Sequence, residues 1–185
     1  MNDYETYLQK AGDYHGHVCA GIALGTKMTL AAMKALGLDP KLKNKNLIVY
    51  VEIDRCMTDA VQTITGCSLG HRSLKYIDYG KFAATFVNLD TKKALRASIK
   101  ESFDSSGPIE EVTSAIARTP DDELVILQEV EIKIAETELP GLPKSRAYCS
   151  SCGERIVDGR EVRKGNGVMC RGCAYGNYYQ ESKTV

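Results

Sequence analysis

The sequence predicts an α+β fold followed by a small cysteine-rich tail, and three observations lead to that prediction. Segments with strand character and segments with helix character follow one another without the strict alternation of a doubly wound sheet. Two prolines and a glycine fall within residues 139–143 and indicate a linker. Four of the seven cysteines lie beyond that linker. We therefore expect a core domain at residues 1–138, a linker at 139–145 and a zinc-finger domain at 146–185.

The composition is that of an ordinary globular protein. A chain of 185 residues with 43% hydrophobic side chains can bury one core and carry an appendage. Its apolar runs, such as residues 47–51, are far shorter than the roughly 20 residues that span a bilayer. The polar N-terminal segment lacks the pattern of a secretory signal. We expect a cytoplasmic protein with no membrane contact, and a net charge of zero argues against nucleic acid as a partner.

Two helices are expected in the first part of the chain, at residues 3–11 and 22–36. Asp3 is a suitable N-cap for the first. The second is rich in Ala, Leu, Met and Lys and ends at Gly37. The loop between them reads DYHGHVCAG and places His17 and Cys19 at or just before a helix N-terminus, where the helix dipole favours a thiolate.

A buried strand and a short helix are expected next. Residues 46–53 are dense in Val, Ile and Leu, and residues 58–65 form a helix closed by Gly66. Cys56 then lies in the turn between them. If the helix begins slightly earlier, Cys56, Asp59 and Thr63 share one face.

The remaining core elements are two strands, two helices and a last strand. Residues 74–79 and 82–89 are expected to pair as a hairpin at Gly80-Lys81. Residues 92–103 show an amphipathic helical pattern, and Pro108 begins another helix that runs to residue 118. Residues 124–134 alternate as a half-exposed strand, with a change of register near Glu129.

The tail carries the spacing of a structural zinc site. Each of its two Cys-x-x-Cys pairs can direct two sulfurs toward one ion, and four thiolates close a tetrahedron. Such a closed site has no open coordination position, so we assign it no catalysis. The expected zinc ligands are Cys149, Cys152, Cys170 and Cys173.

Three sequence motifs in the core resemble the FmdE family, named for the FmdE component of formylmethanofuran dehydrogenase. They are Tyr14-His15-Gly16-His17-x-Cys19-x-Gly21, then Glu52-x-Asp54-x-Cys56-x-x-Asp59-Ala60-x-Gln62-x-x-Thr65-Gly66-Cys67, and Asp78-x-Gly80-Lys81-x-Ala83-x-Thr85-Phe86. The resemblance covers roughly residues 10–135. It implies a thioredoxin-like core, a metal-binding active site at His-Gly-His-x-Cys, a treble-clef tail and association with a molybdenum or tungsten oxidoreductase of one-carbon (formyl or formate) metabolism.

The chain departs from the family pattern at several positions. Ala20 stands where proline is usual, and Ile53 and Met57 stand where Asn and Gly are frequent. Residues 71–73, His-Arg-Ser, replace a Lys-Gly-Asn-like turn. We expect these differences to lie beside the core site and to affect its shape and metal occupancy.

The core site is expected where the three motifs converge at one end of the sheet. His17, Cys19 and Cys56 are the expected ligands of a second zinc or another transition metal, with a fourth position open. The neighbouring residues have weaker assignments: His15 orients the site, Asp59 and Gln62 contact ligands or substrate, and Cys67 is a ligand, a resolving thiol or part of the core.

Two other functions remain open at this point. Cys19 could act as a metal-free redox thiol, with Cys56 or Cys67 resolving it. The whole chain could instead be a non-catalytic adaptor or metal-delivery protein. Under all three hypotheses we expect a homodimer, from the resemblance and from a tail of net +4 that can face a core of net −4.

Overall fold

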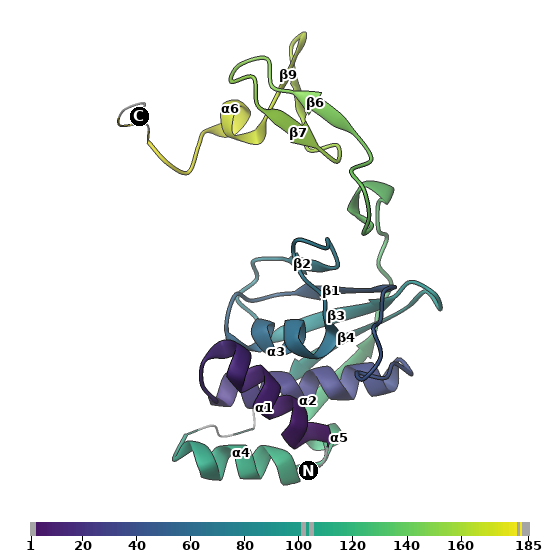
Figure 1. Cartoon of the computed structure of the whole chain (residues 1–185), viewed down its shortest axis with the longest axis vertical. Coiled ribbons are helices and arrows are strands. Elements are labelled where there is room, and N and C mark those ends of the chain that lie inside the picture. The colour runs from purple at the N-terminus through teal and green to yellow at the C-terminus, as the bar shows by residue number, and fades with distance from the viewer. Residues whose placement is uncertain (1–2, 101–102, 104–105, 181, 183–185) are drawn as a thin grey trace. The chain divides into compact units, whose positions relative to one another are not determined.

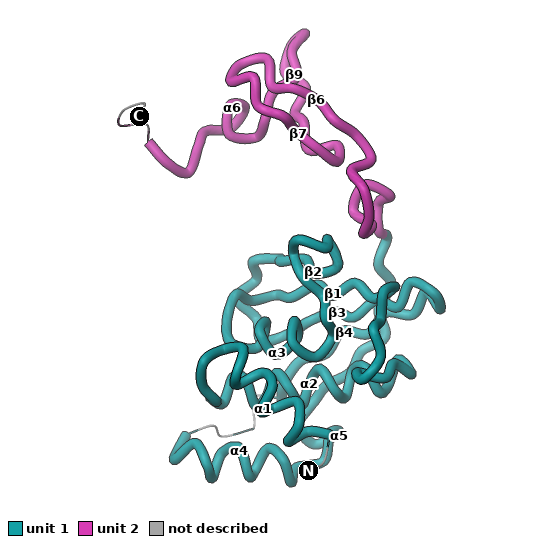
Figure 2. Tube along the Cα trace, in the orientation of Figure 1, with its two compact units in different colours: residues 1–133 teal, residues 134–185 magenta. Residues whose placement is uncertain are grey.

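The computed structural model describes residues 3–100, 103, 106–180 and 182. The chain divides into two compact units, residues 1–133 and 134–185 (Figure 2). Within the described residues, no helix combines the length and the apolar composition needed to cross a membrane.

The first unit is built on a five-stranded mixed sheet in the order β2-β1-β3-β4-β5. β1 and β2 are parallel, and every other neighbouring pair is antiparallel. The strands are β1 (Leu47–Val51), β2 (Leu74–Tyr76), β3 (Ala83–Asn88), β4 (Lys93–Ile99) and β5 (Val125–Glu129). The mixed sheet and its helices confirm the predicted α+β class.

Helices α1, α2 and α3 lie together on one side of this sheet (Figure 1). α2 begins with its capping residue Cys19 and ends in the expected place, so the prediction for residues 22–36 is confirmed. The helices of the unit are α1 (Asp3–His15), α2 (Ala20–Ala35), α3 (Cys56–Thr65), α4 (Ile109–Arg118) and α5 (Asp121–Leu124).

α1 continues past the predicted end at residue 11 and includes His15. It stops at Gly16, whose φ of +95° is accessible to glycine without strain. The Gly16 N–H still donates to the Gly12 carbonyl, at 2.8 Å. His15 is therefore fixed on a helix rather than placed in a loop.

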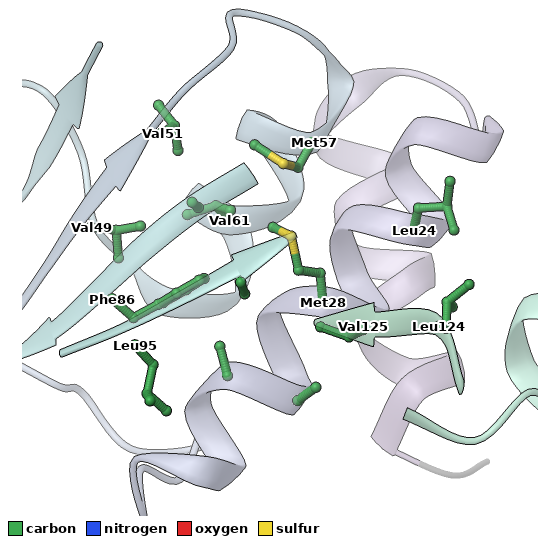
Figure 3. Close-up of a cluster of buried hydrophobic side chains, with 14 of the residues drawn as sticks. Leu24, Met28, Val49, Val51, Met57, Val61, Phe86, Leu95, Leu124 and Val125 are labelled. Atoms are coloured by element: carbon green, nitrogen blue, oxygen red, sulfur yellow. The ribbon is translucent and has the colours of Figure 1, made fainter. Parts of the chain in front are cut away.

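The core lies between the sheet and α2 with α3. Phe86 and Met28 are fully buried and meet there with side chains of β1 and α3, as Figure 3 shows. Gly25 permits the close approach of the two helices, because a Cβ at this position would lie 2.9 Å from the Met57 Cα. This packing holds the N-termini of α2 and α3 together.

The predicted hairpin between residues 74–79 and 82–89 is wrong. β1 lies between β2 and β3 and pairs with both. The central position suits β1, which is buried on both faces and so gains most from a neighbour on each side. The loop before β3 is held by the Glu52 carbonyl, which accepts from the N–H groups of Tyr79 and Lys81.

The predicted helix at residues 92–103 is also wrong. Within this segment, Lys93–Ile99 form strand β4, and residues 101–102 lie outside the described residues. The apolar residues Ala94, Leu95 and Ala97 have spacings that fit the period of a helix, 3.6 residues, as well as that of a strand, two residues, and this explains the helical pattern. β3 and β5 pair with β4 on its two sides, and this tertiary pairing overrides the local helix preference.

In its described residues, the second unit contains two hairpins and a short helix. β6 (Arg146–Tyr148) pairs with β7 (Arg155–Val157), and β8 (Val162–Lys164) pairs with β9 (Gly167–Met169). They are followed by α6 (Arg171–Tyr175), and a 3-10 turn, η1 (Glu136–Glu138), precedes them. The hairpins are joined by a hydrogen bond from the Ser150 N–H to the Val168 carbonyl.

Residues 134–145, which include the expected linker, are bonded to this second unit. The Lys144 N–H donates to Asp158 Oδ1 at 3.0 Å, and the Gly159 N–H donates to Ser145 Oγ at 2.7 Å. Arg160 also pairs with Glu138 at 3.5 Å. These contacts explain why the two units divide between residues 133 and 134, before the proline-rich segment.

Candidate metal centres

The four tail cysteines come together as one group. Their sulfurs all lie within 4.8 Å of one another. A tetrahedral zinc with bonds near 2.3 Å separates its sulfurs by about 3.8 Å, so this group fits the ion. Cys149 and Cys152 come from the turn after β6, while Cys170 caps α6 and Cys173 lies in its first turn.

Backbone N–H groups donate hydrogen bonds to several of these sulfurs. The Cys170 N–H donates to Cys149 Sγ at 3.2 Å, and the Cys173 N–H donates to Cys170 Sγ at 3.3 Å. Donation from the Cys152 and Cys170 backbone lowers the pKa of Cys149 to about 6. The Glu154 N–H likewise lowers the pKa of Cys152, but contact with the other thiols, together with burial, outweighs it and raises this pKa to about 12. A divalent cation would allow all four to ionise.

A second group of donors lies in the core unit, at the junction of α1 and α2. Ligand atoms of His15, His17 and Cys19 all lie within 4.8 Å of one another. The two imidazole rings are 4.8 Å apart between centroids. The positive φ of Gly16 turns the chain between them, and Cys19 begins α2 as its N-cap, with Sγ accepting from the Ile22 N–H at 3.4 Å.

Asp59 on α3 fixes the orientation of His15. Its Oδ2 lies 2.7 Å from His15 Nδ1, and the Gln62 side-chain amide donates to its other oxygen at 3.4 Å. With Nδ1 bonded to the carboxylate, Nε2 of His15 is the nitrogen left for an ion. A carboxylate bonded to the far nitrogen of a histidine is the usual support of a metal ligand.

The structure places Asp59 in contact with the ring of His15, the residue that was expected to orient the site. His15 itself joins the donor group in which Cys56 was expected. The available signal was the alternating pattern His15-x-His17-x-Cys19, which places three donors two residues apart. The sequence could not indicate that Asp59, on another helix, would bond to the first of them.

Cys56 lies beside Cys19 but outside the three-donor group. It is the first residue of α3, and both thiols pack against the same small cluster that contains Ile22 and Ala60. Burial and then the interaction with Cys19 raise the pKa of the Cys56 thiol. A Cβ built on Gly21 would lie within 4 Å of both sulfurs, so the two thiols border the same position.

Cys67 lies away from this junction. It follows the opposite end of α3, and a helix of 10 residues is about 15 Å long. Its side chain is 3% exposed and donates to the Leu47 carbonyl at 3.5 Å. Of the three roles expected for Cys67, its position fits that of a core residue, and the loop that carries it does not meet the N-termini of α2 and α3.

Two of the departures from the family pattern also lie elsewhere than expected. The Met57 side chain is fully buried in the core, where it packs against α2. Residues 71–73 belong to the turn after Cys67, in which the His71 N–H donates to Ser68 Oγ and Ser73 Oγ accepts from the Ser68 N–H. Ala20, by contrast, lies directly beside a donor, Cys19.

Fold and donor groups define the class of protein first: an α+β protein with two sets of side chains that could each hold a metal ion. The chain belongs to the FmdE family (FmdE, molybdenum formylmethanofuran dehydrogenase operon), whose sequence profile matches residues 14–138. This confirms the resemblance found in the three sequence motifs.

Two individual proteins are also similar to the chain. A probable S-adenosyl-L-methionine-binding protein of Archaeoglobus fulgidus is 30% identical over 199 residues, which cover 93% of this chain and 53% of that protein. The chain thus spans about half the length of this curated relative. The crystal structure of a tungsten formylmethanofuran dehydrogenase FmdE-like protein from Syntrophus aciditrophicus covers 96% of this chain and 95% of its own, with a TM-score of 0.63 and 23% identity. At that identity the likeness supports the fold.

Proposed function

We propose that the protein is a two-site metalloprotein that works with a molybdenum or tungsten oxidoreductase of one-carbon metabolism. The tail binds zinc through four thiolates and has a structural role. The core is thioredoxin-like and binds a second zinc or another transition metal through His15, His17 and Cys19. The tail is a treble clef, and the protein acts in the cytoplasm, where reducing conditions keep its thiols free.

One observation carries the proposal for the core: three donors of borderline or soft character lie within 4.8 Å, and one of them is already oriented by a carboxylate. Imidazole and thiolate together suit zinc and other late first-row metals. Three protein ligands leave coordination open, as in sites that bind a small molecule or exchange an ion.

The chain's own residues would prepare the site for that task. Asp59 holds the His15 ring with Nε2 free, and the N-terminus of α2 supports negative charge on Cys19. His17 is exposed and Cys19 is half-buried, so the site can be reached from solvent. A bound ion would act there as a Lewis acid toward an incoming ligand.

The proposed partner is an oxidoreductase of the formylmethanofuran dehydrogenase type. It is supported by the formylmethanofuran dehydrogenase operon that gives the family its description, and by the name of the Syntrophus protein. A homodimer remains part of the proposal. Light scattering at the monomer mass would contradict the dimer, and sedimentation of the chain with a purified formylmethanofuran dehydrogenase, showing no complex at micromolar concentration, would contradict the partner.

Metal analysis of the anaerobically purified full chain tests the two sites. We expect about two equivalents of zinc after incubation with zinc and removal of excess, one for each site. The His17→Ala variant should lose the equivalent of zinc bound in the core and keep the one bound in the tail. His71→Ala is the matched control, because His71 is exposed in a turn of the first unit and belongs to neither donor group. A wild-type content of one equivalent that His15→Ala, His17→Ala and Cys19→Ser all leave unchanged would refute the core site.

A further inference from the structure

We infer that Cys19 and Cys56 form a reversible disulfide that withdraws Cys19 from the core metal site, so that metal binding there depends on the redox state of this pair. The metal half of this inference rests on the proposed function. The disulfide half rests on the placement of the two thiols alone.

The two cysteines begin neighbouring helices whose N-termini meet. Cys19 caps α2 and Cys56 is the first residue of α3. A Cβ placed on Gly21 would lie 3.6 Å from Cys56 Sγ and 3.7 Å from Cys19 Sγ. Both sulfurs thus border the same small space, and the absence of a side chain at Gly21 keeps that space free for them.

Both thiols can be reached by a small reagent. Each is half-buried, whereas Cys67 is buried in the core and bonded to a backbone carbonyl. All seven cysteines are free thiols in this structure. The pair is therefore present in its reduced form, and among the core cysteines it is the pair that a disulfide reagent can attack.

The reaction balances with a low-molecular-weight disulfide, such as oxidised glutathione, as the oxidant. One thiolate of the pair attacks a sulfur of the reagent, forming a mixed disulfide and releasing one thiol. The second cysteine then attacks the mixed disulfide, the Cys19–Cys56 bond forms, and the second reagent thiol leaves. Two electrons and two protons pass from the pair to the reagent, and excess thiol reverses both steps.

Disulfide formation and metal binding compete for one atom. A metal ligand must be a thiolate, and a sulfur engaged in a disulfide is not one. Oxidation would leave only the two histidines of the donor group. Conversely, an ion bound to Cys19 would protect that sulfur from the reagent.

Oxidised glutathione provides the test on the full chain. Zinc-saturated protein and protein treated with a mild chelator are exposed to it, trapped with N-ethylmaleimide and digested with trypsin. Cleavage at Lys10, Lys27, Arg55 and Arg72 places the pair in peptides 11–27 and 56–72. We expect these peptides to be cross-linked, several-fold more in the chelated sample, and released by dithiothreitol.

Three variants complete the design. Cys67→Ala removes the other cysteine of peptide 56–72 and should leave the cross-link unchanged. Cys56→Ser should abolish it, and on oxidation should release less zinc than wild type, because Cys19 then has no partner thiol with which to complete the protein disulfide. Gly21→Ala keeps both thiols but fills the space between them, so it should form less cross-link while retaining the wild-type circular dichroism.

The outcomes separate this inference from the proposed function. Absence of the 11–27/56–72 cross-link from oxidised wild type and from Cys67→Ala overturns the disulfide. A cross-link with equal zinc release from wild type and Cys56→Ser overturns the coupling to metal. If reduced wild type holds no core zinc at all, the proposed function fails and the coupling fails with it, while the peptide map still decides whether the disulfide forms.

Discussion

The carboxylate of Asp59 lies 2.7 Å from Nδ1 of His15, which is 44 residues earlier in the chain. This contact joins α3 to the last residue of α1 and selects the nitrogen that faces the donor group. It connects two of the family motifs physically, the one around His15-Gly16-His17 and the one around Cys56 and Asp59.

Asp59→Asn should therefore weaken metal binding in the core. The neutral amide of Asn lacks the negative charge that Asp59 places beside His15. Loss of such a partner of a histidine ligand typically costs roughly 10- to 100-fold in metal affinity. Competition titration with a chromophoric zinc chelator measures the affinity of the core site. Asp122→Asn, the same change on an exposed residue of α5, is the control. Equal affinities of the two variants would show that the contact does not support a ligand.

Cys170→Ser should abolish the tail site and leave the core site loaded. The serine hydroxyl is a poor zinc ligand, and under the proposed function the small second unit would depend on its metal for much of its folding energy. Zinc content should fall by about one equivalent, and amide exchange should increase in residues 146–175. Exchange in β1 and β3 should stay at the wild-type level. Faster exchange throughout the first unit would show instead that it needs the tail to fold.

Glu52→Gln should destabilise the first unit. Glu52 is 7% exposed and receives two hydrogen bonds from Arg96, at 2.7 and 2.8 Å, so the change leaves a guanidinium without its carboxylate. Because Arg96 is partly exposed, we expect a loss of roughly 2–4 kcal/mol, near or below the usual cost of breaking a buried pair. Urea unfolding of zinc-saturated protein, followed by the helix signal in circular dichroism, measures it. Glu129→Gln, on the exposed end of β5, should change stability by less than about 0.5 kcal/mol.

Gly25→Ala should disturb the packing of α2 on α3. The added methyl would lie 2.9 Å from the Met57 Cα and 3.1 Å from the Ala60 Cβ, and neither atom is at the end of a flexible chain. We expect a loss of about 1–3 kcal/mol in the same unfolding measurement, since the helices must separate. Gly70→Ala is the control, because nothing lies within 4 Å of a Cβ at that position. A Gly25→Ala variant as stable as wild type would mean that the helices can separate at no cost.

Tyr4 should make the first unit less stable in alkaline solution. Burial raises the pKa of its hydroxyl well above 10, the value expected in the unfolded chain. Above about pH 10 the unfolded chain then holds fewer protons than the folded one, so the free energy of unfolding falls as pH rises, by up to about 1.4 kcal/mol per pH unit. Below pH 10 Tyr4 is protonated in both states, and its stabilising contribution to the folded unit is fully present. Tyr4→Phe should reduce this slope between pH 10 and 11.5, whereas Tyr178→Phe, at a fully exposed position, should not change it.

Local sequence was sufficient for elements that carry their own boundary signals. α2 is rich in helix formers and has Gly37 beyond its end, and α4 follows Pro108, so both were predicted where they occur. The grouping of the four tail cysteines could also be predicted from their spacing. A Cys-x-x-Cys pair brings two sulfurs together through its own turn, and two such pairs come close across a short hairpin unit.

The tertiary structure decided what depends on partners distant in sequence. Residues 93–99 form β4 because β3 and β5 pair with them by hydrogen bonds on both sides. β1 lies between β2 and β3 because its side chains are buried on both faces of the sheet. The core donor group was settled in the same way. His15, His17 and Cys19 are neighbours in the sequence, but only the packing of α2 on α3 brings Asp59 to His15 and Cys56 to Cys19, and removes Cys67 to the far end of the helix. A side chain's role at such a site follows from contacts between helices, which no local pattern encodes.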